Sequence, residues 1–192
     1  MVGCCINAVQ HSLVFLKHEV MKDRSLTSIF LIAWLVTTVF GQDEWAKYKP
    51  RTLKQIVTIF AKASFRDPDY VLRDKGQVVF ILSANTFPSL VTVKYTGKSR
   101  TLSAKKKEVI AAWLKVYGPK NPEYLHLFDT EILFTEGRAA YWLPVQVQMV
   151  PFFEQELQKG ENVHLYLVWV GGRKDSGKIE RVFLVNEFKK EE

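Results

Sequence analysis

Six basic residues lie close together near the middle of the chain and could bind an anion. They are Lys94, Lys98, Arg100, Lys105, Lys106 and Lys107. The three consecutive lysines fall in the first turn of a predicted helix, where the partial positive charge of the helix dipole disfavours cations. A bound anion would relieve this conflict. The alternative is a solvated helix end whose charges are screened by salt.

Aromatic residues in the last third of the chain could stack against a flat ligand. Tyr141 and Trp142 fall on opposite faces of a predicted strand, and Trp142 shares its face with Gln146. Trp142 is therefore predicted to face a ligand, whereas Trp169 alternates with leucines and is predicted to lie in the core. The predicted ligand-binding residues are Lys98, Arg100, Lys105, Lys106, Lys107, Trp142 and Gln146.

The stretch from Gly172 to Gly177-Lys178 has the glycine and lysine spacing of a phosphate-binding loop. Such a loop needs a Ser or Thr after the lysine to hold magnesium, and a helix whose first amides face the phosphate. Here Ile179 follows, and the next residues alternate as a strand does. A polar hairpin between two strands is the better interpretation.

Histidines, cysteines and acids give no catalytic pattern. His126 and His164 have no partner placed by sequence spacing to complete a metal site or a nucleophile and base pair. The two cysteines, Cys4 and Cys5, both precede the predicted domain. The acids Asp129, Glu131, Glu136 and Glu187 could meet only through folding, and solvated surface acids are the expectation for them. The sequence therefore predicts no catalytic residue, no cofactor and no metal site.

The N-terminal residues have the pattern of an export signal. Lys22 and Arg24 precede an apolar run over residues 29–40, and small Gly41 precedes polar residues. We expect a signal peptide at residues 21–41, an over-long extension at residues 1–20 and a tether at residues 42–51. The run is short for a bilayer span of about 20 residues. The alternative is that residues 26–40 act as a membrane anchor. Contact with a membrane is expected only if the signal segment is not cleaved.

Residues 52–192 are expected to form one α+β domain. The chain has 192 residues, 47% of them hydrophobic, which suffices for one core. A helix is predicted from Leu53, with Thr52 and Gln55 spaced as a capping box, and a second over residues 103–117, ended by Gly118. Strands are predicted over residues 77–83, 90–96 and 99–102, the last two separated by a turn at Gly97.

The organising stretch of the domain is residues 129–188, where two strands, a short helix and two more strands are predicted. Pro151 suits the first turn of the short helix and Gly160 the position after its end. The fold class is therefore α+β, with a curved antiparallel sheet or a partly open small β-barrel, OB-like barrels included. Two main helices and one short helix are expected to cover one side.

The net charge of +7 is compatible with anionic partners but is also an ordinary aid to solubility. The leading hypothesis is an exported protein, periplasmic or extracellular, that is not an enzyme. It would bind an anionic polymer, an envelope protein or an anionic ligand through a sheet face and a basic rim. One alternative is an exported hydrolase whose carboxylates converge on folding. The other is an oligonucleotide-binding barrel, whose affinity would fall steeply with salt.

Overall fold

A computed structural model describes residues 45–62, 70–73, 78–118, 122–175 and 178–191. The chain divides into two compact units, Met1–Lys47 and Tyr48–Glu192, and the fold described here is that of the second. The predicted extension, signal peptide and beginning of the tether lie outside the described residues, as do the turns expected at 66–69 and 74–76. None of the helices in the described ranges has the length and apolar character needed to cross a bilayer.

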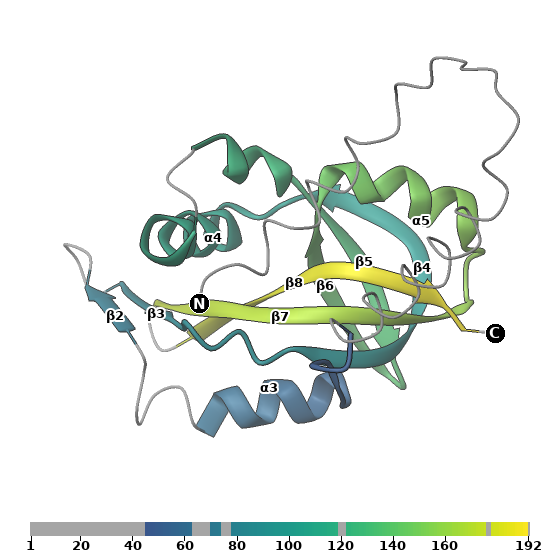
Figure 1. Cartoon of the computed structure of the whole chain (residues 1–192), viewed down its shortest axis with the longest axis horizontal. Coiled ribbons are helices and arrows are strands. Elements are labelled where there is room, and N and C mark those ends of the chain that lie inside the picture. Colours follow the sequence, from purple (N-terminus) through teal and green to yellow (C-terminus); the bar gives the residue numbers. More distant parts are fainter. Residues whose placement is uncertain (1–44, 63–69, 74–77, 119–121, 176–177, 192) are drawn as a thin grey trace, which may run out of the picture. The chain divides into compact units, whose positions relative to one another are not determined.

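One mixed sheet contains the strands of the described residues (Figure 1). They are β1 (Lys49–Pro50), β2 (Tyr70–Arg73), β3 (Val79–Leu82), β4 (Ser89–Thr101), β5 (Thr130–Glu136), β6 (Ala139–Val145), β7 (Asn162–Asp175) and β8 (Lys178–Lys190). Their order is β1-β4-β5-β6-β8-β7-β3-β2, and β4 also pairs with β7. The ring β4-β5-β6-β8-β7 is therefore closed. The predicted α+β class is confirmed, with the barrel as the form that the sheet takes.

The barrel is closed by two contacts between strands that are distant in sequence. β4 pairs antiparallel with β7 from Ser89 to Lys94. β6 and β8 run parallel and meet at one residue pair, Val145 and Val185. β3 and β2 extend the sheet beyond β7. The short strands β1 and β2 were not expected from the sequence, because neither is long enough to show an alternating pattern.

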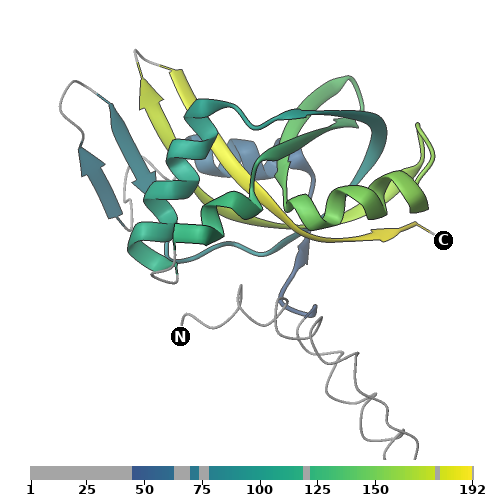
Figure 2. The same ribbon diagram turned by 90° about the horizontal axis from the view of Figure 1, so that it is seen from above.

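β4 is one long bent strand, which differs from the predicted pair of strands joined by a turn at Gly97. The register of β4 against β5 shifts between Tyr95 and Ser99, and Gly97 has φ of 70°. An extra residue at such a bulge bends a strand without ending it. The first half of β4 can therefore pair with β7 while the second half pairs with β5. Figure 2 shows the curved end of β4 beside the β5 and β6 hairpin.

Three α-helices and two 3-10 helices accompany the strands in the described ranges. They are α3 (Leu53–Lys62), α4 (Ala104–Tyr117), α5 (Val150–Glu156), η1 (Pro122–Leu127) and η2 (Val147–Met149). The capping box of α3 is confirmed: the Thr52 amide donates to Gln55 Oε1 at 2.9 Å and the Gln55 amide to Thr52 Oγ1 at 3.0 Å. α4 begins after Ser103, and the Gly118 amide donates to the Leu114 carbonyl where it ends.

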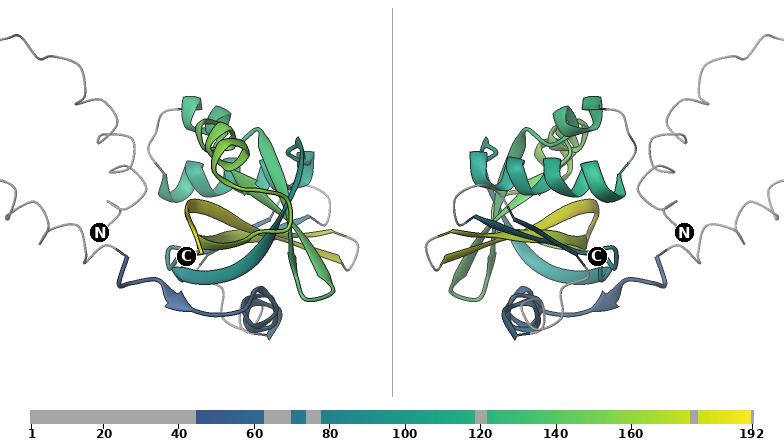
Figure 3. Two further views of the ribbon diagram at one scale, coloured as in Figure 1. Left: turned by 90° about the vertical axis from the view of Figure 1, so that its right-hand side faces the viewer. Right: turned by 90° about the vertical axis from the view of Figure 1, so that its left-hand side faces the viewer.

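Two apolar clusters occupy the two faces of β7, which is apolar on both faces as the sequence predicted. Leu165, Leu167 and Trp169 belong to the barrel interior together with the buried face of α3, and Val168 and Val170 pack with α4. α3 and α4 thus lie on opposite sides of β7 and β8 (Figure 3). The expectation that the helices cover one side was wrong, because a strand that is apolar on both faces needs a cover on each.

Candidate functional site

The candidate site lies on the outward-facing residues of β4, β5 and β6, hereafter the outer face. Inward-pointing residues of these strands, such as Tyr95, Phe134 and Leu143, are buried in the barrel. The strand register places Arg100 opposite Glu131, and Leu133 opposite Trp142. Residues from three strands therefore meet on one surface, next to the first turn of α4.

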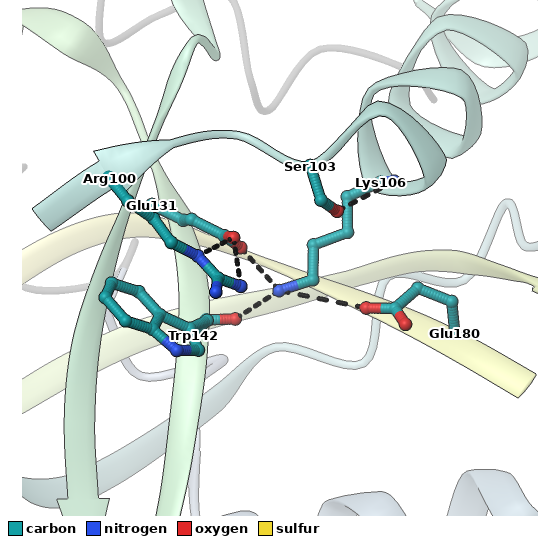
Figure 4. Close-up of polar contacts among 6 residues, drawn as sticks. All are labelled: Arg100, Ser103, Lys106, Glu131, Trp142 and Glu180. Atoms are coloured by element: carbon teal, nitrogen blue, oxygen red, sulfur yellow. Dashed lines mark hydrogen bonds and ion pairs between the residues drawn. The ribbon is translucent and has the colours of Figure 1, made fainter.

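Glu131 is the centre of a buried ion cluster (Figure 4). Its side chain is 0% exposed. Arg100 Nε donates to Glu131 Oε1 at 2.6 Å, and Lys106 Nζ donates to Oε2 at 2.5 Å. Lys106 Nζ also donates to the Trp142 carbonyl at 2.6 Å and lies 3.9 Å from a Glu180 oxygen. One buried carboxylate thus binds two cations, and both of its oxygens are engaged.

Arg100 and Trp142 form a surface that a ligand can reach. The guanidinium carbon of Arg100 lies 4.0 Å from the centre of the Trp142 ring, which is the geometry of a cation–π contact. The Arg100 side chain is 48% exposed and Trp142 is partly buried. We call this pair the Arg100–Trp142 platform. Glu131 holds the platform from below by its bond to Arg100.

The acids that balance the three consecutive lysines come from distant parts of the chain. Lys106 pairs with Glu131, Lys105 with Asp175 at 3.2 Å, and Lys107 with Asp129. The charge conflict at the start of α4 is therefore relieved within the protein, without a bound anion. The expectation of solvated acids was wrong for Glu131, because its position on β5 faces the lysine of a helix that covers it.

The predicted ligand-binding residues are divided by the fold. Arg100, Lys106 and Trp142 come together in the cluster. Lys98 is exposed beside the bulge of β4, and Gln146 follows β6 and accepts a hydrogen bond from Gln148 at 2.8 Å. The side chains of Lys105 and Lys107 turn to Asp175 and Asp129. Their roles in ligand binding remain predictions.

Unpaired positive charge remains on the outer face. Lys94 and Lys98 on β4 and Arg138 in the turn between β5 and β6 are exposed. Among the described residues, no acid forms an ion pair with any of these three. The nearby carboxylate of Glu136 is also engaged, since it accepts the Leu53 and Lys54 amides at 2.7 and 3.0 Å. The acids around this face are thus used internally, and its free charges are cations.

The two histidines of the domain lie on different elements. His126 is exposed in η1, and His164 Nδ1 lies 2.9 Å from Thr92 Oγ1 on the exposed side of the sheet. In the part of the chain that the structure describes, no group of three or more His, Cys, Asp or Glu could hold a metal ion. Gly172 lies within β7, and Asp175 pairs with Lys178 of β8. The predicted hairpin is confirmed in place of a phosphate-binding loop.

Four acids at the site could not be assigned from sequence spacing: Asp129, Glu131, Asp175 and Glu180. The sequence holds a weak signal for Glu131, because it precedes the apolar run of Ile132, Leu133 and Phe134. A polar residue in such a context is expected where another element covers the strand.

No protein-family model, curated protein or solved structure matches this chain. Function must therefore be inferred from the geometry of the site.

Proposed function

We propose that the protein is an exported, non-catalytic module that binds an extended anionic polymer across the outer face of β4, β5 and β6. The observation that carries this proposal is the Arg100–Trp142 platform, in which a half-exposed guanidinium lies 4.0 Å from an indole ring. A cation held on an aromatic ring offers both charge and a flat surface. Binding requires neither a nucleophile nor a general base.

The form of the barrel supports this location. β4, β5 and β6 are its first three strands in chain order, and OB-like barrels bind oligonucleotides and oligosaccharides over their second and third strands. Because one fold can host many functions, this likeness supports the location of the binding surface and does not identify the ligand. The stronger support is that Leu133 and Trp142 occupy that surface, with Lys94, Lys98 and Arg100 along its edge on β4.

The hydrolase alternative has weaker support. A hydrolase of this kind needs two carboxylates that face one substrate bond. Glu131 is fully buried, and both of its oxygens accept hydrogen bonds from cations. Glu180, the nearest acid on the other side of Lys106, lies 3.9 Å from the same ammonium group. These carboxylates have a structural role in the cluster, which favours binding over bond cleavage.

A panel of anionic polymers tests the proposal. Polyphosphate, a sulfated polysaccharide and single-stranded DNA are each titrated into the protein, and the melting temperature is followed, since a ligand that binds only the folded form stabilises it. We expect stabilisation that falls with salt and is reduced in Lys94→Glu/Lys98→Glu. Lys115→Glu, an exposed charge reversal in the last turn of α4, is the control for a change of charge outside β4. Absence of stabilisation by every polymer would refute the proposal.

Export is the second part of the proposal and rests on the apolar run at residues 29–40 and the small residue that follows it. Cleavage after Gly41 would release a domain that begins at Gln42. N-terminal sequencing of the protein from cell fractions tests this. A mature start at Gln42 outside the cytoplasm supports export, whereas an intact N-terminus in the membrane fraction supports an anchor at residues 26–40.

A further inference from the structure

We infer that the polymer is a single-stranded nucleic acid, one base of which stacks on the Arg100–Trp142 platform. This inference rests on the proposed function and narrows its ligand to one chemical class. Three features of the outer face support it. The plane of the Arg100 guanidinium is fixed, the guanidinium lies over one face of the Trp142 ring, and β4 carries a row of cations.

The plane of the Arg100 guanidinium is fixed by Glu131. Nε donates to Glu131 Oε1 at 2.6 Å, and Nη2 lies 2.6 Å from the same oxygen. The Glu131 carboxylate is itself held in place, because Lys106 binds its Oε2 atom and the Glu131 side chain is completely buried. Nη1 of Arg100 has no hydrogen-bond partner among the described residues. The platform is thus pre-organised, with the N–H groups of Nη1 available to a ligand.

The guanidinium covers one face of the indole ring of Trp142. This cover determines whether a sugar ring or a base of the ligand can stack there. A saturated sugar packs its C–H groups against a bare aromatic face. A guanidinium plane instead stacks with flat unsaturated rings such as bases, as occurs in single-stranded RNA recognition. A polymer without rings, such as polyphosphate, would gain nothing from the platform beyond its charge. The platform therefore favours a polymer that bears bases.

A row of cations accompanies the platform along β4. Lys94, Lys98 and Arg100 are exposed on this strand, and a Cβ added at Gly97 would lie 3.9 Å from the Cβ of Lys159, which brings another exposed lysine to the bulge. Exposed cations beside a stacking surface are the arrangement that single-strand binding proteins use, with the backbone on the charges and the bases on the aromatic groups. In a duplex the faces of the bases are already stacked on one another, so the platform would have no base to receive.

The test compares probes that differ only in their bases. Fluorescence anisotropy measures the affinity of the full chain for a short oligothymidylate, for an abasic oligonucleotide with the same number of phosphates, and for a duplex of that length. The salt concentrations are about 50 and 200 mM, a range over which phosphate contacts weaken strongly. We expect the base-bearing strand to bind about 5- to 150-fold more tightly than the abasic strand, the effect of one stacked base.

Variants show which residues produce the preference for the base-bearing strand over the abasic strand. Trp142→Ala and Arg100→Lys should abolish the difference between the two strands, whereas Trp142→Phe should retain most of it. Lys94→Glu/Lys98→Glu should weaken both strands alike, and Lys115→Ala should change neither. Melting temperatures of all variants establish that they are folded. If Trp142→Ala does not fold, Arg100→Lys provides the second measurement, because it removes the guanidinium plane and leaves the indole in place.

The outcomes separate this inference from the proposed function. Equal affinity for the base-bearing and abasic strands, tighter binding of the duplex, or tighter binding of a sulfated polysaccharide would overturn the nucleic-acid inference and leave polyanion binding intact. A base preference that survives both Trp142→Ala and Arg100→Lys would overturn the assignment of the platform. Failure of every anionic polymer to bind would overturn both proposals.

Discussion

Replacing Glu131 with alanine should be among the most destabilising single changes at the site. The carboxylate is the anionic partner of Lys106 at 2.5 Å, and the Lys106 side chain is only 7% exposed. After the replacement, the buried ammonium group keeps the Trp142 carbonyl and a Glu180 oxygen 3.9 Å away. It therefore remains out of water without a close counter-charge.

The size of the effect follows from burial. Removing one partner of a buried ion pair costs about 3–5 kcal/mol, because the other charge is left uncompensated. Arg100 adds little to this cost, since its half-exposed side chain can be hydrated. For a domain of 150–250 residues, 1 kcal/mol shifts the melting temperature by about 2–4 °C, so Glu131→Ala should lower it by about 6–20 °C.

Two further variants make the comparison quantitative. Lys107→Met removes a pair whose side chains are 39% and 42% exposed, and such pairs contribute about 0–1 kcal/mol. The double variant Lys106→Met/Glu131→Leu replaces the buried pair with apolar groups and should recover most of the loss, as such replacements often do. Urea denaturation measures all three free energies of unfolding. A loss for Glu131→Ala no greater than that for Lys107→Met, or a double variant as unstable as Glu131→Ala, would contradict the stabilising role of the buried carboxylate.

Three other changes give independent checks, each measured by urea denaturation. Glu136→Ala removes the carboxylate that caps two amides at the start of α3 and should cost about 0.5–2 kcal/mol; no loss would contradict this capping role. Gly171→Ala should cost more than Gly160→Ala, because a Cβ at Gly171 would lie 2.4 Å from the Ile81 carbonyl oxygen, whereas nothing lies within 4 Å at Gly160; equal losses would contradict the close approach of β3 and β7. Burial raises the pKa of Tyr95 and of Tyr141 above 10.0, with a smaller contribution from Glu154 and Glu136 respectively. The unfolded chain therefore loses these protons first. The contribution of the two tyrosines to stability should be constant below about pH 10 and fall as pH rises through the higher folded pKa. Tyr95→Phe/Tyr141→Phe should flatten this fall, and an unchanged alkaline profile would contradict it.

Local patterns were sufficient to predict most elements of the domain. The alternation of Val91, Val93 and Tyr95 identified the buried face of β4, and all three are at most 5% exposed. Phe153 and Leu157 face the core around α5 as predicted. These predictions succeed because the period of the apolar residues depends on the backbone conformation of a few neighbouring residues.

Closure of the barrel could not be predicted in this way. Thr92 and His164 lie side by side on β4 and β7 although 72 residues separate them in the chain. The seam between β6 and β8 rests on Val145 and Val185, whose apolar character fits any buried strand. The bulge at Gly97 gave the same signal as a turn, because both conformations favour a glycine with positive φ. Only the packing of the whole sheet distinguishes them.

The distribution of lysines explains why the site was only partly predictable. The densest basic run, Lys105 to Lys107, is paired with acids that lie 70, 25 and 22 residues away. α4 has no acid in its own first turn, so these pairs offset the conflict with its dipole and fix the helix on the barrel. Positive charge that is paired with an acid in this way attracts a ligand less than unpaired charge does, and the half-exposed Arg100, which shares Glu131 with Lys106, keeps part of its charge. The free cations are instead the separated lysines of β4, which lie on the same outer face as Trp142 with β5 between them. In a basic protein, the charge available for binding is therefore found by subtracting the ion pairs of the folded state, and not by locating the highest density of lysine in the sequence.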